Sequence, residues 1–312
     1  MANGAKKVAV IGAGNVGATC AFVLAERKVG DVVLLDIYEG FAKGKALDMS
    51  QGGQVLNYDG RVTGTKDYAD IADSDVVVVT SGFPRQPGMT REDLIGKNAD
   101  IVSQVGEGIR QHAPNSIVVM VTNPLDLMTY HMQKVTGFEH SRVVGQAGIL
   151  DSARMTHFIA QAVGCSNEDV QAMVLGGHGD TMVPLPRYTT VNGIPVSQLL
   201  SDEEVEAICM RTASGGGEIV KLLEKGSAFY APGSAAAIMA EAILDDRKRV
   251  LPCSTYLSGE YGMDDIYIGV PVVLGRNGVE RIIELELAEN ELDSLQSSGS
   301  FYKEQLSEIL GY

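Results

Sequence analysis

One histidine of this 312-residue chain lies between glycines, where it could transfer protons to and from a bound molecule. His178 is part of GGHGD at residues 176–180, which follows the apolar run AMVL. Imidazole changes its charge near neutral pH and can donate or accept a proton. Core packing explains such a position poorly. The other histidines lie in or beside helical patterns and are interpreted as surface or structural residues: His112, His131, His140 and His157.

Polar residues that could assist a catalytic histidine lie in two further segments. Asp151 and Arg154 are three residues apart in DSAR, so a helix would place them on one face, as it would a simple surface ion pair. Asn123 follows the apolar run SIVVMVT and could hydrogen-bond a ligand oxygen. The pair Asn123-Pro124 could equally form a plain turn, and it is a candidate cis peptide.

Two arginines lie in one expected loop of a chain that is otherwise acidic. The segment GFPRQPGMTR at residues 82–91 contains Arg85 and Arg91 and follows the run DVVVVT closely. In α/β proteins, ligands bind at the loops that follow the parallel strands. The two guanidinium groups therefore suit an anionic substrate, and a pair of solvated loop arginines is the alternative.

The elements that must position these residues alternate between strands and helices in the first half. Runs that are apolar on both faces are typical of buried strands in a parallel sheet. Helices are expected from Val16 to about Lys28 and around Leu47. The alternation predicts an α/β fold with a doubly wound parallel sheet. Its strands are expected at Lys7–Ile11, Asp31–Asp36, Arg61–Gly64, Asp75–Thr80 and Ser116–Thr122.

The second half has a different pattern and predicts a separate α+β domain. We expect one domain at residues 1–146 and a second at residues 147–312. A helical region from Ser201 to about Asp246 is expected to break at Gly215–Gly217 and at Pro232. The other expected elements are a helix at Asp151–Val163, a strand at Val170–Leu175, antiparallel strands at Val250–Leu257 and Asp265–Leu274 joined by a turn at Gly259–Gly262, and an amphipathic helix at Glu284–Leu310.

The motif GAGNVG at residues 12–17 lies between the first expected strand and helix. There Gly12 permits a tight turn, Gly14 lets the backbone approach a pyrophosphate, and Gly17 lets helix and strand pack closely. The helix N-terminus offers free N–H groups to the phosphates. Asp36 at the end of the second strand could accept hydrogen bonds from a ribose 2′-OH and would repel a 2′-phosphate, which favours NAD over NADP. A solvated Asp36, and an FAD or sugar-nucleotide ligand, are the alternatives.

Composition and charge exclude several classes of partner. The formal net charge of −15 disfavours binding to nucleic acid and to anionic membranes. The four cysteines are far apart and form no CxxC pair, which is typical of reduced thiols in a cytoplasmic protein. We expect no signal peptide and no membrane span, because no apolar run approaches the roughly 18 residues that a span needs. No cluster with metal-ligand spacing is evident, so no metal is expected.

In chain order, the motifs GAGNVG, Asp36, PRQPGMTR, VTNP, DSAR and GGHGD resemble the lactate/malate dehydrogenase family. The resemblance extends from Val8 to the final helix and is closest to malate dehydrogenases that are themselves similar to lactate dehydrogenases. It implies an N-terminal Rossmann domain, a C-terminal substrate domain, and NAD as the cofactor. It also implies cofactor contacts by Gly12, Gly14, Asn15, Val16, Gly17, Asp36, Thr80, Gly82, Asn98, Val121 and Asn123.

The same resemblance implies a role for each candidate catalytic residue. His178 would exchange a proton with the substrate oxygen, while Asp151 would orient the imidazole and stabilise its protonated form. Arg154 would bind the C1 carboxylate in a bidentate pair. Arg91 would polarise the substrate carbonyl, and Asn123 would help to position the same oxygen.

Position 85 distinguishes two substrates within the family. Oxaloacetate carries a second carboxylate where pyruvate has a methyl group, and a buried carboxylate needs a charged partner. Arg85 supplies one where similar lactate dehydrogenases carry Gln, and its loop would close over the substrate. Ala228 stands where those enzymes have the bulkier Thr. We expect reversible hydride transfer between (S)-malate/oxaloacetate and NAD⁺/NADH, with a lactate dehydrogenase or a non-catalytic dinucleotide-binding module as alternatives.

The resemblance also implies an assembly of several copies of the chain. Members of the family form dimers and tetramers through helical faces, and the lactate-like malate enzymes tend towards tetramers. We therefore expect a cytoplasmic homo-oligomer, with a tetramer favoured over a dimer and a small-molecule substrate as its other partner.

Overall fold

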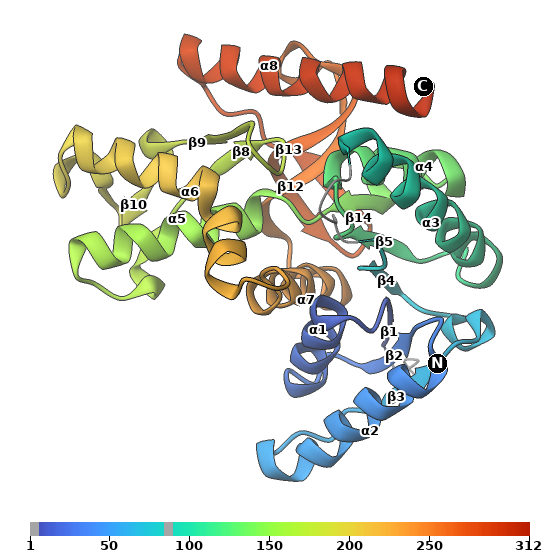
Figure 1. The fold of residues 1–312 in the computed structure, drawn as a ribbon. Coiled ribbons are helices and arrows are strands. Elements are labelled where there is room, and N and C mark those ends of the chain that lie inside the picture. Colours follow the sequence, from blue (N-terminus) through green and yellow to red (C-terminus); the bar gives the residue numbers. More distant parts are fainter. Residues whose placement is uncertain (1–5, 84–89) are drawn as a thin grey trace.

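The computed structural model describes residues 6–83 and 90–312, and for Arg91 it describes the backbone alone. Strands and helices alternate through the first half (Figure 1). The five strands predicted there are confirmed to within one residue at most ends, whereas the helices at Arg91–His112 and Leu125–Thr136 and the strand at Val143–Gly145 were not predicted. The elements of this half are β1 (Lys7–Ile11), α1 (Asn15–Glu26), β2 (Asp31–Leu35), α2 (Glu39–Leu56), β3 (Val62–Thr65), β4 (Val76–Val79), α3 (Arg91–His112), β5 (Ile117–Met120), α4 (Leu125–Thr136) and β6 (Val143–Gly145).

The second half mixes long helices with antiparallel strands. Its most extended feature is the predicted hairpin of two long strands, β12 and β13, which pair antiparallel. The elements are α5 (Gly148–Val163), β7 (Val170–Gln171), β8 (Val174–Gly176), β9 (Met182–Pro184), β10 (Thr190–Val191), β11 (Ile194–Pro195), α6 (Asp202–Leu223), α7 (Tyr230–Leu244), β12 (Arg249–Ser258), β13 (Asp264–Gly275), β14 (Gly278–Ile282) and α8 (Glu289–Gln305).

Six parallel strands form the N-terminal part of the main sheet, in the order β3-β2-β1-β4-β5-β6. The order reverses between β1 and β4, and ligands bind at such a switch point beyond the carboxyl ends of the strands. The GAGNVG segment follows β1 at this place. The sheet continues through β12, which pairs antiparallel with β6 at Ser254 and Gly145, and through β13, which pairs with β8 at Gly269 and Gly176. The segment that carries His178 is thereby attached to the sheet.

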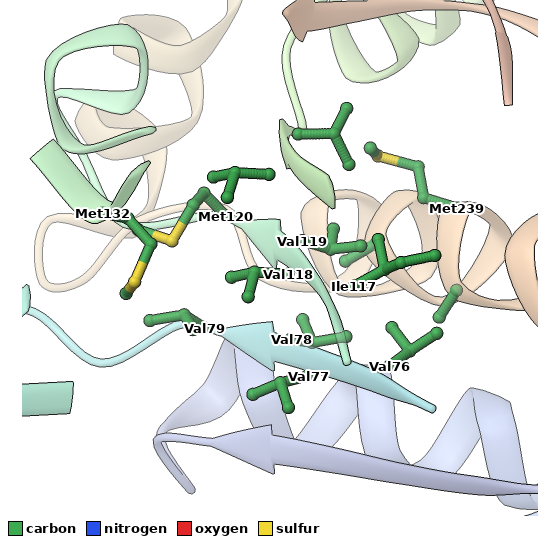
Figure 2. Packing of buried hydrophobic residues seen from close by; sticks show 14 of the residues in the cluster. Val76, Val77, Val78, Val79, Ile117, Val118, Val119, Met120, Met132 and Met239 are labelled. Atoms are coloured by element: carbon green, nitrogen blue, oxygen red, sulfur yellow. The ribbon is translucent and has the colours of Figure 1, made fainter. Parts of the chain in front are cut away.

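The apolar runs of β4 and β5 lie at the centre of the core. All eight of their residues are buried, because helices cover both faces of the sheet. Figure 2 shows Met132 from α4 and Met239 from α7 on opposite sides of these strands. Helix α7 also packs closely against α1, which places a helix of the second half beside the first βα unit (Figure 1).

The expected break at Gly215–Gly217 is wrong, since α6 runs through these glycines without interruption. A capping box at Ser201 begins the helix, and the side chain of Arg154 lies against the glycine segment, where a Cβ at position 215 would be 3.2 Å from its Cδ. The glycines therefore serve a close approach and do not end the helix. The interruption lies instead at residues 224–229. Pro232 is in the first turn of α7, where its missing N–H disrupts no helical hydrogen bond.

Two further expectations need correction. The strand predicted at Val170–Leu175 is divided, because β7 pairs with β10 whereas β8 pairs with β9 and β13. The helix predicted from Glu284 begins only at Glu289. The residues before it make other hydrogen bonds, since the N–H of Leu285 donates to Tyr261 Oη and Tyr188 Oη donates to the carbonyl of Glu286.

Among residues 6–83 and 90–312, no helix is long and apolar enough to cross a membrane.

Candidate active site

His178 and Asp151 are brought together by the loop after β8 and the first turn of α5. His178 Nδ1 lies 2.8 Å from Asp151 Oδ2, and both side chains are largely buried. A carboxylate can only accept at this contact, so Nδ1 carries the proton and donates it. This arrangement leaves Nε2 as the ring nitrogen that can exchange a proton with a substrate.

Arg154 binds the other oxygen of the same carboxylate. Its Nη1 donates to Asp151 Oδ1 over 2.9 Å, so one aspartate links the histidine to the arginine. Both residues belong to α5 and share a face, as their spacing predicted. Asp151 is buried, which excludes a simple surface ion pair. The guanidinium group has five N–H donors, and most remain available to bind an anion.

The electrostatics around His178 favour its protonated form. Burial alone would lower the pKa of His178, but the charge and hydrogen bond of Asp151, together with the charge of Asp126, outweigh it. The positive charge of Arg154 opposes them. The net result is a pKa above the ordinary histidine value, which keeps proton exchange accessible near neutral pH.

Three residues that sequence reasoning missed stabilise the segment that carries His178 by hydrogen bonds: Asp126, Ser254 and Ser298. The backbone N–H of His178 donates to Asp126 Oδ2 over 2.9 Å, and Ser254 Oγ donates to Asp126 Oδ1 over 2.7 Å. The N–H of Gly177 donates to Ser298 Oγ of α8 over 3.0 Å. Asp126 lies in the first turn of α4, where an acid is also typical of a solvated helix start, so the sequence contains no specific signal for its buried partners.

The GAGNVG segment has the shape that a pyrophosphate requires. Gly12 has a φ of +103°, and a Cβ there would lie 2.7 Å from Thr80 Oγ1. A Cβ at Gly17 would collide with the carbonyl oxygen of Gly12. Around Gly14, in contrast, a Cβ would meet nothing within 4 Å, and no side chain caps α1. Open space thus adjoins the free N–H groups of a helix N-terminus, which fits a bound phosphate.

Asp36 lies beside this glycine segment. Its Oδ2 accepts the N–H of Ala13 over 2.7 Å, and its Oδ1 accepts the N–H of Tyr38 over 3.0 Å. Lys45, which sequence reasoning missed, donates to the carbonyl of Ala13 over 2.8 Å. Burial lowers the pKa of Lys45, and the charge of Asp36 opposes that effect. The carboxylate is therefore fixed at the edge of the proposed ribose site.

The remaining candidate cofactor residues lie just after β4, just after β5 and, for Asn98, in α3. Asn98 is buried, and its side chain binds backbone on two sides, donating to the carbonyl of Asn123 over 2.6 Å and accepting the N–H of Phe83 over 2.6 Å. The expected cis peptide at Asn123-Pro124 is confirmed. A Cβ at Gly82 would lie 2.7 Å from Thr122 Cγ2, so that glycine permits a close approach. Val121 is half-buried directly after β5.

Two buried polar atoms at this edge of the sheet have no hydrogen-bond partner among the described residues. They are Ser81 Oγ, just after β4, and Gln146 Nε2, just after β6. Buried polar groups are rarely left unpaired, so a polar ligand at the carboxyl ends of the strands would satisfy them. The residues present therefore fit a dinucleotide cofactor.

The two loop arginines are not described equally. Arg85 lies outside the described residues, and Arg91 begins α3 with a side chain that is not described. The backbone at this point is fixed by a capping box, in which Thr90 Oγ1 accepts the N–H of Asp93 over 3.1 Å. The roles expected for both arginines stay predictions. Within the described part of the chain, no group of three histidine, cysteine or acidic side chains is arranged to hold a metal ion.

Comparison with known proteins identifies the class to which this fold and site belong. Residues 6–145 match the lactate/malate dehydrogenase NAD-binding domain, and residues 149–311 match the α/β C-terminal domain of the same family. The chain therefore belongs to the lactate/malate dehydrogenase family, a family of NAD-dependent oxidoreductases. The domain boundary expected after residue 146 lies between the two matched segments and stays a prediction.

Relatives and solved structures agree with this assignment. The malate dehydrogenase of Methanosarcina acetivorans is 54% identical over 303 residues, which are 97% of this chain and 99% of the relative. A malate dehydrogenase structure from Salinibacter ruber is 50% identical and covers 97% of both chains with a TM-score of 0.94. A Cryptosporidium parvum lactate dehydrogenase in complex with lactic acid and nicotinamide adenine dinucleotide is 42% identical, covers 99% of both chains and has the same TM-score. Backbone similarity alone therefore does not separate the two substrates.

Proposed function

We propose that this chain is an NAD-dependent malate dehydrogenase that interconverts (S)-malate and oxaloacetate. The observation that carries the proposal is the buried chain of contacts in which Asp151 binds His178 through one oxygen and Arg154 through the other. A proton-exchanging group and an anion-binding group are thus held in one rigid unit. A 2-hydroxy acid presents the two matching features, a hydroxyl group beside a carboxylate.

The residues divide the reaction between them. Bound NAD supplies the hydride acceptor, and NADH the hydride donor, for C2 of the substrate. His178 Nε2 accepts the hydroxyl proton of malate in oxidation and returns it to the carbonyl oxygen of oxaloacetate in reduction. Asp151 keeps the proton on Nδ1 and stabilises the imidazolium that forms. Arg154 binds the C1 carboxylate with the N–H groups that Asp151 leaves free. Arg91 and Asn123 are expected to bind the substrate oxygen.

NAD(H) is favoured over NADP(H) by the position of Asp36. The carboxylate is bound to the N–H of Ala13, beside the open space at Gly14. A ribose at this place would donate hydroxyl hydrogen bonds to Asp36, whereas a 2′-phosphate would meet its negative charge. The match of residues 6–145 to an NAD-binding domain agrees with this preference.

Malate is favoured over lactate by the residue at position 85. Arg85 would pair with the second carboxylate of oxaloacetate, which pyruvate lacks. Ala228, half-buried in the segment between α6 and α7, would leave room for the larger substrate where similar lactate dehydrogenases carry the bulkier Thr. The 54% identity to a protein named malate dehydrogenase supports the same choice.

The test is to follow the loss of NADH absorbance with oxaloacetate and with pyruvate offered in parallel. We expect fast oxidation with oxaloacetate and little with pyruvate. Arg85→Gln should lower kcat/KM for oxaloacetate by about 10²-fold or more, because a buried carboxylate would lose its charged partner, and should raise turnover of pyruvate. An unchanged preference in this variant would remove Arg85 from the proposal, and a wild-type preference for pyruvate would favour the lactate dehydrogenase alternative.

A homo-oligomer, with a tetramer favoured over a dimer, is part of the same proposal. Helix α2 supports it, since large apolar side chains on this helix are exposed in the single chain, among them Leu47, Val55 and Leu56. Apolar surface of this kind marks contacts between proteins. Light scattering on the purified protein measures the number of copies directly.

A further inference from the structure

A second carboxylate is buried beside the proposed catalytic histidine, in addition to Asp151. Asp126 is the second residue of α4 and is 1% exposed. Its Oδ2 accepts the backbone N–H of His178 over 2.9 Å, and its Oδ1 accepts from Ser254 Oγ of β12 over 2.7 Å. Helix α4, strand β12 and the loop after β8 therefore meet at Asp126, which binds the backbone of the residue that exchanges the proton.

Hydrogen bonding alone does not explain why this residue carries a charge. An asparagine would accept the His178 N–H through Oδ1, and its NH₂ group could donate to the Ser254 hydroxyl, which is also an acceptor. Burying an ionised carboxylate is unfavourable unless other charges compensate for it. Burial raises the pKa of Asp126 to about 6, although the hydrogen bonds from Ser254 and from the His178 backbone oppose this rise. The carboxylate is therefore ionised above about pH 6.

The charges around His178 show what the additional carboxylate does. Among the described side chains, the charged groups that act on the imidazole are Asp151 and Arg154 from α5 and Asp126 from α4. With neutral histidine, these three groups sum to one uncompensated negative charge. Protonation of His178 brings the cluster to neutrality, which is the favoured state in a site of low dielectric constant. Without the charge of Asp126, the neutral state would instead be reached with unprotonated histidine.

We propose that Asp126 is a positioning residue that fixes the backbone of His178 and, by its negative charge, holds the imidazole in its protonated form for reduction of the 2-oxo acid. The inference rests on the proposed dehydrogenase function, since it assigns to Asp126 a share in the proton exchange of His178. Asp126 touches neither substrate nor cofactor in this scheme and acts through the histidine.

The test compares Asp126→Asn with the parent enzyme in two measurements. The first is the pH dependence of kcat/KM for oxaloacetate reduction, which requires protonated His178 and therefore falls above its pKa. We expect this fall to begin at a pH lower by about half a unit or more in Asp126→Asn, with a reduced kcat at alkaline pH and unchanged NADH affinity. The second is the NMR titration of ¹⁵N-labelled histidine side chains, with the His178 signal assigned by its absence in His178→Asn. The same downward shift is expected there.

Two further variants separate charge from hydrogen bonding. Asp126→Ala removes both, so it should show the same pKa shift as Asp126→Asn together with a further loss of kcat, because the His178 N–H loses its acceptor. Glu241→Gln is the matched control for loss of a buried carboxylate. Glu241 forms ion pairs with Arg27 and Arg247 and is not among the groups that shift the pKa of His178, so this variant should titrate as the parent does.

The outcomes are distinct from those that test the proposed function. If the parent enzyme does not reduce oxaloacetate, the proposed function fails, and the NMR titration still measures the influence of Asp126 on His178. If His178 titrates within about 0.2 pH units of the parent value in Asp126→Asn, the charge has no effect on the imidazole and the inference is overturned. A shift of equal size in Glu241→Gln would also overturn it, since the effect would then be general.

Discussion

Replacing Asp151 by asparagine should disable His178 without disturbing the fold around it. The carboxylate accepts at both oxygens, from His178 Nδ1 over 2.8 Å and from Arg154 Nη1 over 2.9 Å. An asparagine has one acceptor oxygen, and Arg154 can only donate, so the oxygen should turn towards Arg154. The NH₂ group then faces His178 Nδ1. The ring must present a lone pair there, which moves its proton to Nε2, the atom that has to accept the proton of malate.

The size of the effect follows from two losses. A hydrogen bond to a charged group contributes about 1.5–3 kcal/mol, which corresponds to roughly 10- to 100-fold in rate. Removing an adjacent opposite charge lowers a histidine pKa by about 1–3 units, which makes Nε2 a weaker base for the proton of malate and depletes the protonated form needed for reduction. In a Ser-His-Asp triad, the same exchange leaves histidine in the wrong tautomer and lowers the rate about 10⁴-fold. We therefore expect kcat for malate oxidation to fall by about 10²- to 10⁴-fold in Asp151→Asn.

The assay measures malate oxidation and oxaloacetate reduction from about pH 5 to pH 9, where a histidine titrates. NADH affinity, followed by fluorescence, should stay unchanged, because Asp151 is outside the GAGNVG segment. Asp180→Asn is the matched control, since Asp180 is exposed in the segment that carries His178. A loss below about threefold in Asp151→Asn, with an unshifted pH profile, would refute the role given to this carboxylate.

Two predictions concern the cofactor. Gly17→Ala should weaken NADH binding at least about tenfold and lower Tm, because the new Cβ would collide with the carbonyl oxygen of Gly12. Gly14→Ala is the matched control for stability, because the space around Gly14 is open. Equal Tm values for the two variants would contradict the packing argument. Asp36→Ala should raise the ratio of kcat/KM for NADPH to that for NADH by about tenfold or more. It should also weaken NADH binding, because Asp36 accepts the N–H of Ala13. Steady-state kinetics with both cofactors measure the ratio, and an unchanged ratio would remove Asp36 from cofactor selection.

The parallel sheet and its glycine segment could be predicted because their signals are local. The runs at β4 and β5 are apolar at every position, short and rich in β-branched residues, which is typical of a strand covered on both faces. GAGNVG is informative because Gly12 and Gly17 each meet a steric demand made by residues within the same βα unit or just after the adjacent strand, whereas Gly14 leaves open space for a ligand. The spacing of Asp151 and Arg154 likewise predicted a shared face within a single helix.

Features that depend on distant partners were not predictable in this way. The glycines of α6 have the composition of a helix break, and only the approach of Arg154 from α5 explains why the helix passes through them. Residues 170–175 have the composition of one strand, yet β7 at one end and β8 at the other belong to different sheets. Asp126 was missed for the same reason, since its partners are on β12 and in the loop after β8.

The buried carboxylate at position 126 links the proposed function to the stability of the fold. Its pKa of about 6 in the folded state exceeds the ordinary aspartate value by roughly two units, which corresponds to about 3 kcal/mol of destabilisation when it is ionised. Because the folded state binds the proton more tightly, stability falls as pH rises from about 4 to about 6, and the penalty is fully present above pH 6. Asp126→Asn should therefore unfold at an equal or higher Tm than the parent above pH 6, and this advantage should shrink as the pH approaches 4. A loss of turnover combined with a gain in stability in Asp126→Asn would indicate that the charge of Asp126 acts on His178 and does not stabilise the fold. A Tm difference that does not change with pH would show that Asp126 is not the group that titrates.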